Sequence, residues 1–496
     1  MKSLSGIIKS FYRSLRGLVV DNDIDPFPLR EDLRQTTGRT LVADGRSALN
    51  VALLAFPQGL AYASIANLPV QYGITCSIVA AIIAPLLSSS RFTILGPTNA
   101  TAFMVAGAMA SFSLSDKLHL MPLLVFLVGI LLVAGAYCRI ADLIQYISRS
   151  VVVGYITGAA VLIIANQLRH VLGIDEAIRQ AAFDDQGTAG SGMPSFFSIL
   201  TDIARQISHV DWRPLLLTVI TGGIYLLTRR KLKNIAFPIA LVAGSILGSI
   251  LPMEVPMVTG FDIQSLAPVT SGFDDPRILD QFASLVGPAI GIAFLASLEN
   301  SVMAKTLASR SGARPRLNQE MLSLGATNLC TSFLSGMPAS GSFTRSALNA
   351  ESGARTRLAS IFSGLLCLVG ALIFGPYVSS IPKCCLAALV MAIAISLIQP
   401  RNIRICLNAT RSDAIVLIAT FIASLLAPLH IAIFIGTATS ILLYIKKASR
   451  PELAEYAFNQ EGQLAETATA NQRNNPAISI VHVEGELFFG AAELFR

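Results

Sequence analysis

The sequence contains little charge and lacks the residue sets that catalysis and metal binding require. Charged residues make up 14% of its 496 residues, against roughly 25% in an ordinary soluble domain. Its five histidines are scattered and form no nucleophile–base or metal-ligand set. The seven cysteines lie mostly in apolar segments, without metal-site spacing, and their odd number argues against a disulfide framework. We therefore expect neither an enzyme nor a protein with a resident metal or organic cofactor.

Two further features are missing, a cleavable signal peptide and the ~10-residue alternating segments of a membrane β-barrel. The start of the chain, Met1–Arg46, is polar and mixed in charge, so we expect it to stay in the cytoplasm. Apolar runs of about 17–25 residues recur almost to the end of the chain. They predict an all-α polytopic protein of the inner or plasma membrane, in contact with lipid. The net charge of +7 fits a lysine and arginine excess in cytoplasmic loops, and no nucleic-acid partner is expected.

Fourteen apolar elements are expected, and their ranges are 42–66, 72–90, 98–112, 119–138, 150–168, 214–229, 236–252, 282–306, 317–335, 342–352, 357–377, 381–399, 412–427 and 429–446. A full crossing needs about 20 residues, so the third and tenth elements are expected as short half-helices. With the N-terminus inside, the basic residues after even-numbered elements, such as Arg91 and Arg229–Lys233, face the cytoplasm, and so do both termini. Seven elements per half, at about 42–252 and 282–446, predict an inverted repeat.

The third and tenth elements each follow a break rich in glycine, proline and hydroxyl residues, at Gly96–Thr101 and Gly336–Ser346. Such residues favour the start of a new helix. The first N–H groups of a helix have no intrahelical partner and carry roughly half a positive charge. Two interrupted segments in corresponding positions indicate a transporter binding site, and their N-termini predict that an anion occupies it.

Glu299 lies in an apolar stretch of the eighth element, where an ionised and unpaired carboxylate costs several kcal/mol. One interpretation is a site that binds H⁺ or Na⁺ and couples this ion to the substrate. The other is a permanent ion pair with Arg345 or Lys305 that fixes helix packing. Arg345, one turn into the tenth element, either attracts the substrate anion or neutralises Glu299 in the empty site.

Gln58 and Tyr62 lie on one side of the first element. Pro57 kinks this helix, so the Gln58 amide is expected to face the cavity, with Tyr62 one turn further on. For Tyr62, a packing role is the alternative.

Hydroxyl residues cluster at the second break. Ser342 and Thr344 offer hydroxyls and backbone N–H groups to an anion, whereas N-capping alone explains Ser340. Capping also accounts for Asn318–Glu320, which begin the ninth element.

Five motifs in order resemble the SulP (solute carrier 26) family of anion transporters over residues 40–450, namely Pro57–Ala63, Gly96–Pro97, Ala304–Ala308, Asn318–Glu320 and Ser342–Ser346. The resemblance implies core and gate domains, elevator-like movement of the core, and a homodimer. It implies a substrate site between the third and tenth elements, formed by Gln58, Tyr62, Thr98, Ser342, Phe343, Thr344 and Arg345. Glu299 takes the coupling position. Many relatives have an aromatic residue where this chain has Thr98, so a wider or more polar site is expected.

The character of the sequence changes after residue 450. Residues 451–475 are expected as a polar linker, and the following residues alternate like a β-strand. Residues 483–492 resemble the start of the STAS domain, an α/β domain that follows the membrane part in this family. The expected domains are a cytoplasmic segment (1–41), a transport domain (42–450), the linker, and a truncated STAS start (476–496).

Together these features predict a secondary active transporter of small anions of the sulfate, bicarbonate or dicarboxylate class. The resemblance favours H⁺-coupled symport, because the bicarbonate/sodium branch typically has aspartate where this chain has Glu299. Na⁺-coupled symport and an uncoupled exchanger or channel remain alternatives. A uracil- or purine-type transporter of this architecture would have a neutral site without Arg345.

Overall fold

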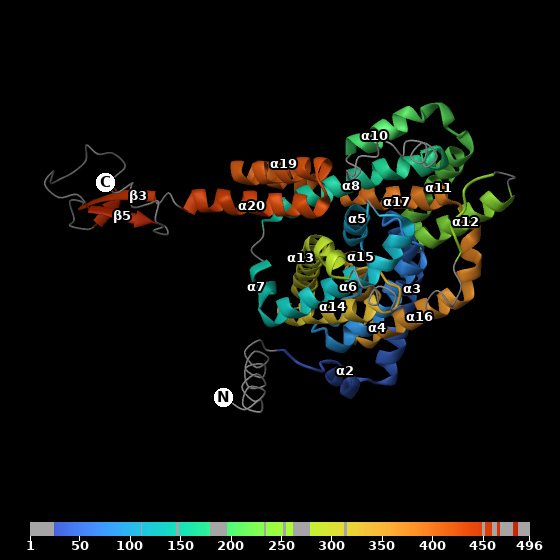
Figure 1. The fold of residues 1–496 in the computed structure, drawn as a ribbon. Coiled ribbons are helices and arrows are strands. Elements are labelled where there is room, and N and C mark those ends of the chain that lie inside the picture. The colour runs from blue at the N-terminus through green and yellow to red at the C-terminus, as the bar shows by residue number, and fades with distance from the viewer. Residues whose placement is uncertain are drawn as a thin grey trace, which may run out of the picture.

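The computed structural model consists mainly of helices (Figure 1). It describes residues 24–110, 112–144, 148–178, 196–232, 235–250, 254–260, 278–311, 315–448, 452–458, 464–466 and 480–484. Helices of the first half are α2 (Leu29–Gln35), α3 (Gly38–Ile65), α4 (Gln71–Leu87), α5 (Asn99–Ala108), α6 (Leu114–Tyr137), α7 (Ile140–Ile144), α8 (Arg149–Val171), α10 (Phe196–Arg205), η1 (Ile207–His209), α11 (Trp212–Lys231) and α12 (Ala236–Ile250). Those of the second half are α13 (Ile278–Ser311), α14 (Leu317–Ser332), α15 (Phe343–Glu351), α16 (Leu358–Phe374), η3 (Gly375–Ser380), α17 (Lys383–Leu397), α18 (Pro400–Ala409), α19 (Arg411–Leu426) and α20 (Leu429–Ala448).

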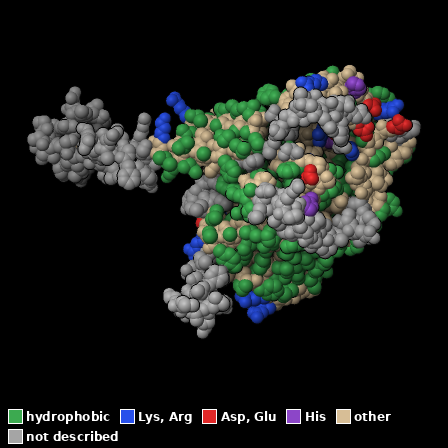
Figure 2. Space-filling view, viewed as in Figure 1, with side chains coloured by type: hydrophobic (Ala, Val, Ile, Leu, Met, Phe, Trp, Pro, Cys, Tyr) green, Lys and Arg blue, Asp and Glu red, His purple; other side chains and the backbone are tan. Residues whose placement is uncertain are grey.

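A helix occupies each of the fourteen ranges expected from the apolar runs. Within the described residues, six stretches are long and apolar enough to cross a membrane, namely Gly38–Ile65, Leu114–Tyr137, Arg149–Val171, Phe282–Ala308, Leu358–Ser380 and Lys383–Ala409. In Figure 2, hydrophobic side chains cover much of the visible face of these helices, and lysine and arginine side chains appear toward its edges. This distribution fits a protein that spans the membrane several times.

The helices pack in two groups. The first helix group contains α3, α4, α5, α6, α13, α14, α15 and α16, and the second contains α8, α11, α12, α17, α19 and α20. Figure 1 shows α4, α14 and α16 in the lower part of the molecule and α8, α11 and α19 in the upper part. The groups meet where α3, α5 and α13 contact α17 and α20.

Glycines allow the closest helix crossings of the first group. A Cβ atom on Gly59 of α3 would lie 3.0 Å from the Gly73 carbonyl oxygen of α4. A Cβ atom on Gly129 of α6 would lie 2.8 Å from the backbone nitrogen of Leu329 in α14. Small residues permit such approaches between membrane helices. The two crossings hold together the helices that flank the breaks.

The two sequence breaks lie side by side inside the first helix group. They form a short antiparallel pair between β1 (Leu95–Gly96) and β2 (Ser340–Gly341), with Gly96 opposite Ser340. The Ser342 amide extends the pairing by donating to the Ile94 carbonyl at 3.1 Å. Helix α5 starts directly after β1 and helix α15 directly after β2. The pairing therefore brings the N-termini of both short helices into one region.

The C-terminal part differs from the expected linker. Strand β3 (Glu452–Phe458) and strand β4 (Leu464–Glu466) lie within residues 451–475 and pair antiparallel. Strand β5 (Ile480–Glu484), which the alternating pattern predicts, pairs with β3. Leu453, Tyr456 and Phe458 supply strand residues that the polar composition of the segment concealed. Residues 1–23, 476–479 and 485–496 of the expected terminal domains lie outside the described residues.

Candidate functional site

Glu299 of α13 joins the two breaks. Its Oε2 atom accepts a hydrogen bond from the Thr98 hydroxyl at 3.1 Å and another from the Ser340 hydroxyl at 2.7 Å. Thr98 belongs to the first break and Ser340 to the second, so one carboxylate oxygen links the two breaks. Among the described residues, Oε1 of Glu299 has no hydrogen-bond partner.

Arg345 is the largest completely buried side chain in the described part of the chain, with 0% exposure. Its Nη2 donates to the Pro97 carbonyl at 2.7 Å. The guanidinium also lies against Gly96, where an added Cβ would be 2.7 Å from Nη1. Both residues belong to the first break, although Arg345 itself belongs to α15. Its positive charge is therefore held beneath the meeting point of the two short helices.

The ion pair between Glu299 and Arg345, one form of the packing interpretation, is not formed, although the structure describes both residues. The packing interpretation is wrong for this partner, and Lys305 was its other candidate. The physical reason is that each group already has neutral partners, hydroxyls for the carboxylate and a backbone carbonyl for the guanidinium. The two charges therefore do not neutralise one another in this structure.

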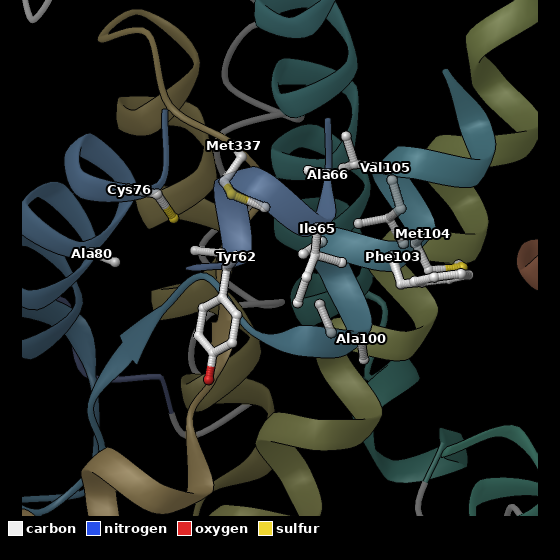
Figure 3. Close-up of a cluster of buried hydrophobic side chains, with 14 of the residues drawn as sticks. Tyr62, Ile65, Ala66, Cys76, Ala80, Ala100, Phe103, Met104, Val105 and Met337 are labelled. Atoms are coloured by element: carbon white, nitrogen blue, oxygen red, sulfur yellow. The ribbon is translucent and has the colours of Figure 1, made fainter. Parts of the chain in front are cut away.

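Gln58 and Tyr62 of α3 are buried beside the breaks. The Oε1 atom of Gln58 is buried without a hydrogen-bond partner. Figure 3 shows Tyr62 in a cluster with Cys76 and Met337, with its hydroxyl pointing away from Met337. The ring therefore packs in the apolar cluster, and its hydroxyl end leaves that cluster.

The N-terminus of α15 has no side-chain cap. Its N-cap, Ser342, makes no side-chain capping hydrogen bond, and its hydroxyl has no partner among the described residues. Phe343 is 48% exposed, and Thr344 is also exposed. The predicted substrate residues thus fall into two sets, because Gln58, Tyr62, Thr98, Ser342 and Arg345 are buried while Phe343 and Thr344 are not. The first turn of α15 thus combines an uncapped helix start with two exposed side chains.

Sequence reasoning missed the partners of Glu320 and Ser340. Glu320 does not cap its own helix, because it accepts hydrogen bonds from the Ser89 and Ser90 amides, both at 2.8 Å, at the end of α4. Ser340 does not cap α15 either, since its hydroxyl bonds Glu299. No signal in the sequence pairs positions so far apart.

Buried charges also tie α2 to the first helix group. Arg357 forms an ion pair with Asp32 at 2.9 Å, and the Arg357 backbone amide donates to the same carboxylate. The Gln319 amide group donates to the Asp25 carbonyl at 3.0 Å. Removing one partner of such a buried ion pair costs about 3–5 kcal/mol. The segment before α3 is therefore a fixed part of this group.

The comparisons with known proteins agree with this geometry. Residues 41–420 match the Sulfate permease family. The chain belongs to this family. Family membership makes it a multi-pass membrane transporter of the sulfate and anion transporter class, and not an enzyme.

Similar relatives come from distant organisms. The putative sulfate transporter YvdB of Bacillus subtilis is 25% identical over 452 residues, which are 89% of this chain and 79% of that protein. The probable sulfate transporter Rv1739c of Mycobacterium tuberculosis is 28% identical over 93% of this chain and 81% of that protein. The sodium-independent sulfate anion transporter of Bos taurus is 26% identical over 89% of this chain and 75% of that protein.

Solved structures share the fold of this family member. The structure of SLC26A9 matches with a TM-score of 0.84 at 20% identity, covering 99% of this chain and 79% of that one. The transmembrane domain of the cyanobacterial bicarbonate transporter BicA matches with a TM-score of 0.68 at 18% identity. This match covers 82% of this chain and 98% of that one.

Proposed function

We propose that this protein is a secondary active transporter of small anions, that sulfate is its first candidate substrate, and that it works by H⁺-coupled symport. The observation that carries the proposal is the meeting of two helix N-termini around Glu299 and Arg345. Helix N-termini and a buried guanidinium favour an oxyanion. The names of the relatives support sulfate, and the BicA neighbour keeps bicarbonate as a second candidate. Dicarboxylates share the same chemistry.

The contacts of Glu299 suggest how the cation is coupled to the anion. An ionised Glu299 opposes a second negative charge nearby, so the anion binds best when a proton neutralises the carboxylate. Neutral Glu299 still accepts hydrogen bonds from Thr98 and Ser340, so the two breaks stay together. Na⁺ is the alternative ion, because carboxylate and hydroxyl oxygens also suit a hard cation.

The two helix groups support an elevator mechanism. The breaks, Glu299 and Arg345 all belong to the first helix group. Movement of this group against the second would carry the whole site across the membrane without separating its parts. Each group takes corresponding elements from both halves, the first four of each in one group and the last three in the other. This division supports a fourteen-element, seven-plus-seven inverted repeat. We propose in addition that both termini are cytoplasmic and that the protein forms a homodimer.

An uptake panel in proteoliposomes tests the proposal. Labelled sulfate, bicarbonate, fumarate and chloride are offered with an inward proton gradient, with an inward Na⁺ gradient, or with neither. We expect sulfate to accumulate when the inside is more alkaline, and this accumulation to collapse with a protonophore. Strict dependence on Na⁺ without pH dependence would assign the other coupling ion. Exchange without accumulation under any gradient would identify an uncoupled exchanger.

A further inference from the structure

A second hollow lies apart from Glu299 and Arg345. It has a volume of about 550 Å³ and is bordered by the loop after α3, the end of α5, the start of α6, the end of α8, helix α10 and the start of α17. None of the predicted substrate residues lines it. The cavity reaches Gly107 near the end of α5, whereas Thr98 precedes the start of that helix. On α5 the cavity is lined from Phe103 to Gly107, which lie about 8 to 14 Å along the helix from Thr98.

The cavity lies at the end of the helices opposite to the arginine-rich connections. Lys117 is in the first turn of α6 and Arg139 follows its last turn, while Arg169 is near the end of α8 and Arg149 is at its start. A 24-residue helix such as α6 spans about 36 Å. With both termini in the cytoplasm, as proposed above, the cavity opens toward the outer side.

Cations dominate the charged lining. Lys117, Arg169 and Lys383 line the cavity together with His170, and Asp202 is its one acidic side chain among the described residues. Behind the wall, the buried Asp175 lies 3.5 Å from Arg169 Nε and 4.0 Å from Lys383 Nζ, and it also faces His170. Asp175 therefore balances part of the charge contributed by α8 and α17.

Lys117 is the cation that this arrangement does not balance. Its ammonium group has no ion pair and no hydrogen bond among the described residues, and its side chain is half-buried at the cavity wall. Arg169 lines the same cavity, so the two like charges repel one another. An anion between Lys117 and Arg169 would relieve this repulsion.

We propose that this outer cavity is a capture site for a small inorganic oxyanion such as sulfate, held between Lys117 and Arg169. The proposal rests on the proposed function, because capture has a purpose only if an anion then moves to the Glu299–Arg345 site. Arg169 also donates through Nη2 to the Asn67 side chain at 2.8 Å. Asn67 follows α3 of the first helix group and Arg169 is part of α8 of the second, so the capture site is built across the group boundary.

A cysteine at Gly107 tests access and charge without any need for transport. A Cβ atom on Gly107 meets nothing within 4 Å, so Gly107→Cys fits the cavity. The background carries Cys138→Ser and Cys330→Ser, because the remaining cysteines are buried. An anionic methanethiosulfonate should modify this cysteine at least about fivefold faster than a cationic one of equal size. Sulfate should slow the reaction, and Lys117→Gln should bring the two rates together.

Uptake by intact cells supplies the second measurement, since only the outer face is exposed to the added sulfate. Lys117→Gln should raise the KM for external sulfate about 3- to 10-fold and leave the maximal rate unchanged. Lys117→Arg keeps the charge and should restore the KM. Arg404→Gln removes an exposed charge from α18, which follows the opposite end of α17, and should not alter the KM.

The two measurements separate the two proposals. A cysteine that reacts with neither reagent, or that reacts equally with both and is not protected by sulfate, overturns the capture site even if transport is intact. An unchanged KM in Lys117→Gln overturns it as well. Anion preference and sulfate protection in a protein that takes up no sulfate would support the site, and the proposed transport function would then be the part that fails.

Discussion

The two short helices occupy matching places in the two halves of the chain, yet their N-termini are arranged differently. Helix α5 is closed by a capping box, in which Thr98 and Thr101 each bond the backbone of the other. Helix α15 has no side-chain cap, and Phe343 and Thr344 of its first turn are exposed. Since each helix start has donors without intrahelical partners, α15 has the greater capacity to bind a ligand. Under the proposed function, this difference assigns α5 to positioning the site and α15 to holding the anion.

Arg345→Ala should have the largest effect on sulfate affinity, because it removes the buried positive charge of the uncapped helix α15. Loss of one partner from a buried charged contact costs about 2–5 kcal/mol, so sulfate affinity should fall by about 30-fold or more. Equilibrium binding of labelled sulfate to purified protein gives the value. Arg345→Lys keeps the charge and should lose less. Wild-type affinity in Arg345→Ala would remove this residue from the anion site and make the two helices equivalent.

Glu299→Gln should separate accumulation from exchange. The amide keeps a hydrogen-bond acceptor for Thr98 and Ser340 but cannot change its charge. Uphill uptake driven by a proton gradient should vanish, while sulfate–sulfate counterflow stays within about threefold of wild type. Both rates are measured in the same proteoliposomes. If Glu299→Gln still accumulates sulfate, coupling lies elsewhere in the chain.

Gly96→Ala should have an intermediate effect, through the contact between the two breaks. The added methyl would lie 2.7 Å from Arg345 Nη1, and the Gly96 φ of +155° is also unfavourable for a side chain. The guanidinium must shift, which should lower kcat/KM for sulfate about 10-fold or more, since a shift of about 1 Å can cost 100-fold. Gly222→Ala on α11 is the control, because its methyl meets nothing within 4 Å and Gly222 lines neither proposed site. Equal activity of both variants would contradict a role for the Gly96–Arg345 contact.

The smallest expected effect concerns the caps themselves. Thr98→Ala should destabilise the protein by about 1 kcal/mol, because it removes the cap of α5. It also removes one donor to Glu299. Ser342→Ala removes no capping hydrogen bond and should leave the melting temperature unchanged. Thermal unfolding of the two variants side by side measures the difference. A larger loss in Ser342→Ala would reverse the assignment of the closed and open helices.

The sequence predicted the helix ranges and the two breaks well, because apolar runs and Gly/Pro signals are local properties. It could not predict that Arg345 bonds Pro97 in place of Glu299, since that choice depends on side-chain geometry between distant segments. The same limit applies to Glu320 and to the outer cavity around Lys117, whose walls come from several separate stretches of both halves. Strand β3 was missed because its polar residues resemble those of a linker. The substrate roles of the site residues stay predictions.

The ion pair between Asp32 and Arg357 has a practical consequence for watching this protein work. Helix α2 is fastened to the first helix group, so a spin label or dye on its exposed residues, such as Leu33, reports the position of that whole group. A partner label on α18, which packs with α8 and α19, would report the other group. The distance between the two probes then serves as a ruler for the conformational cycle.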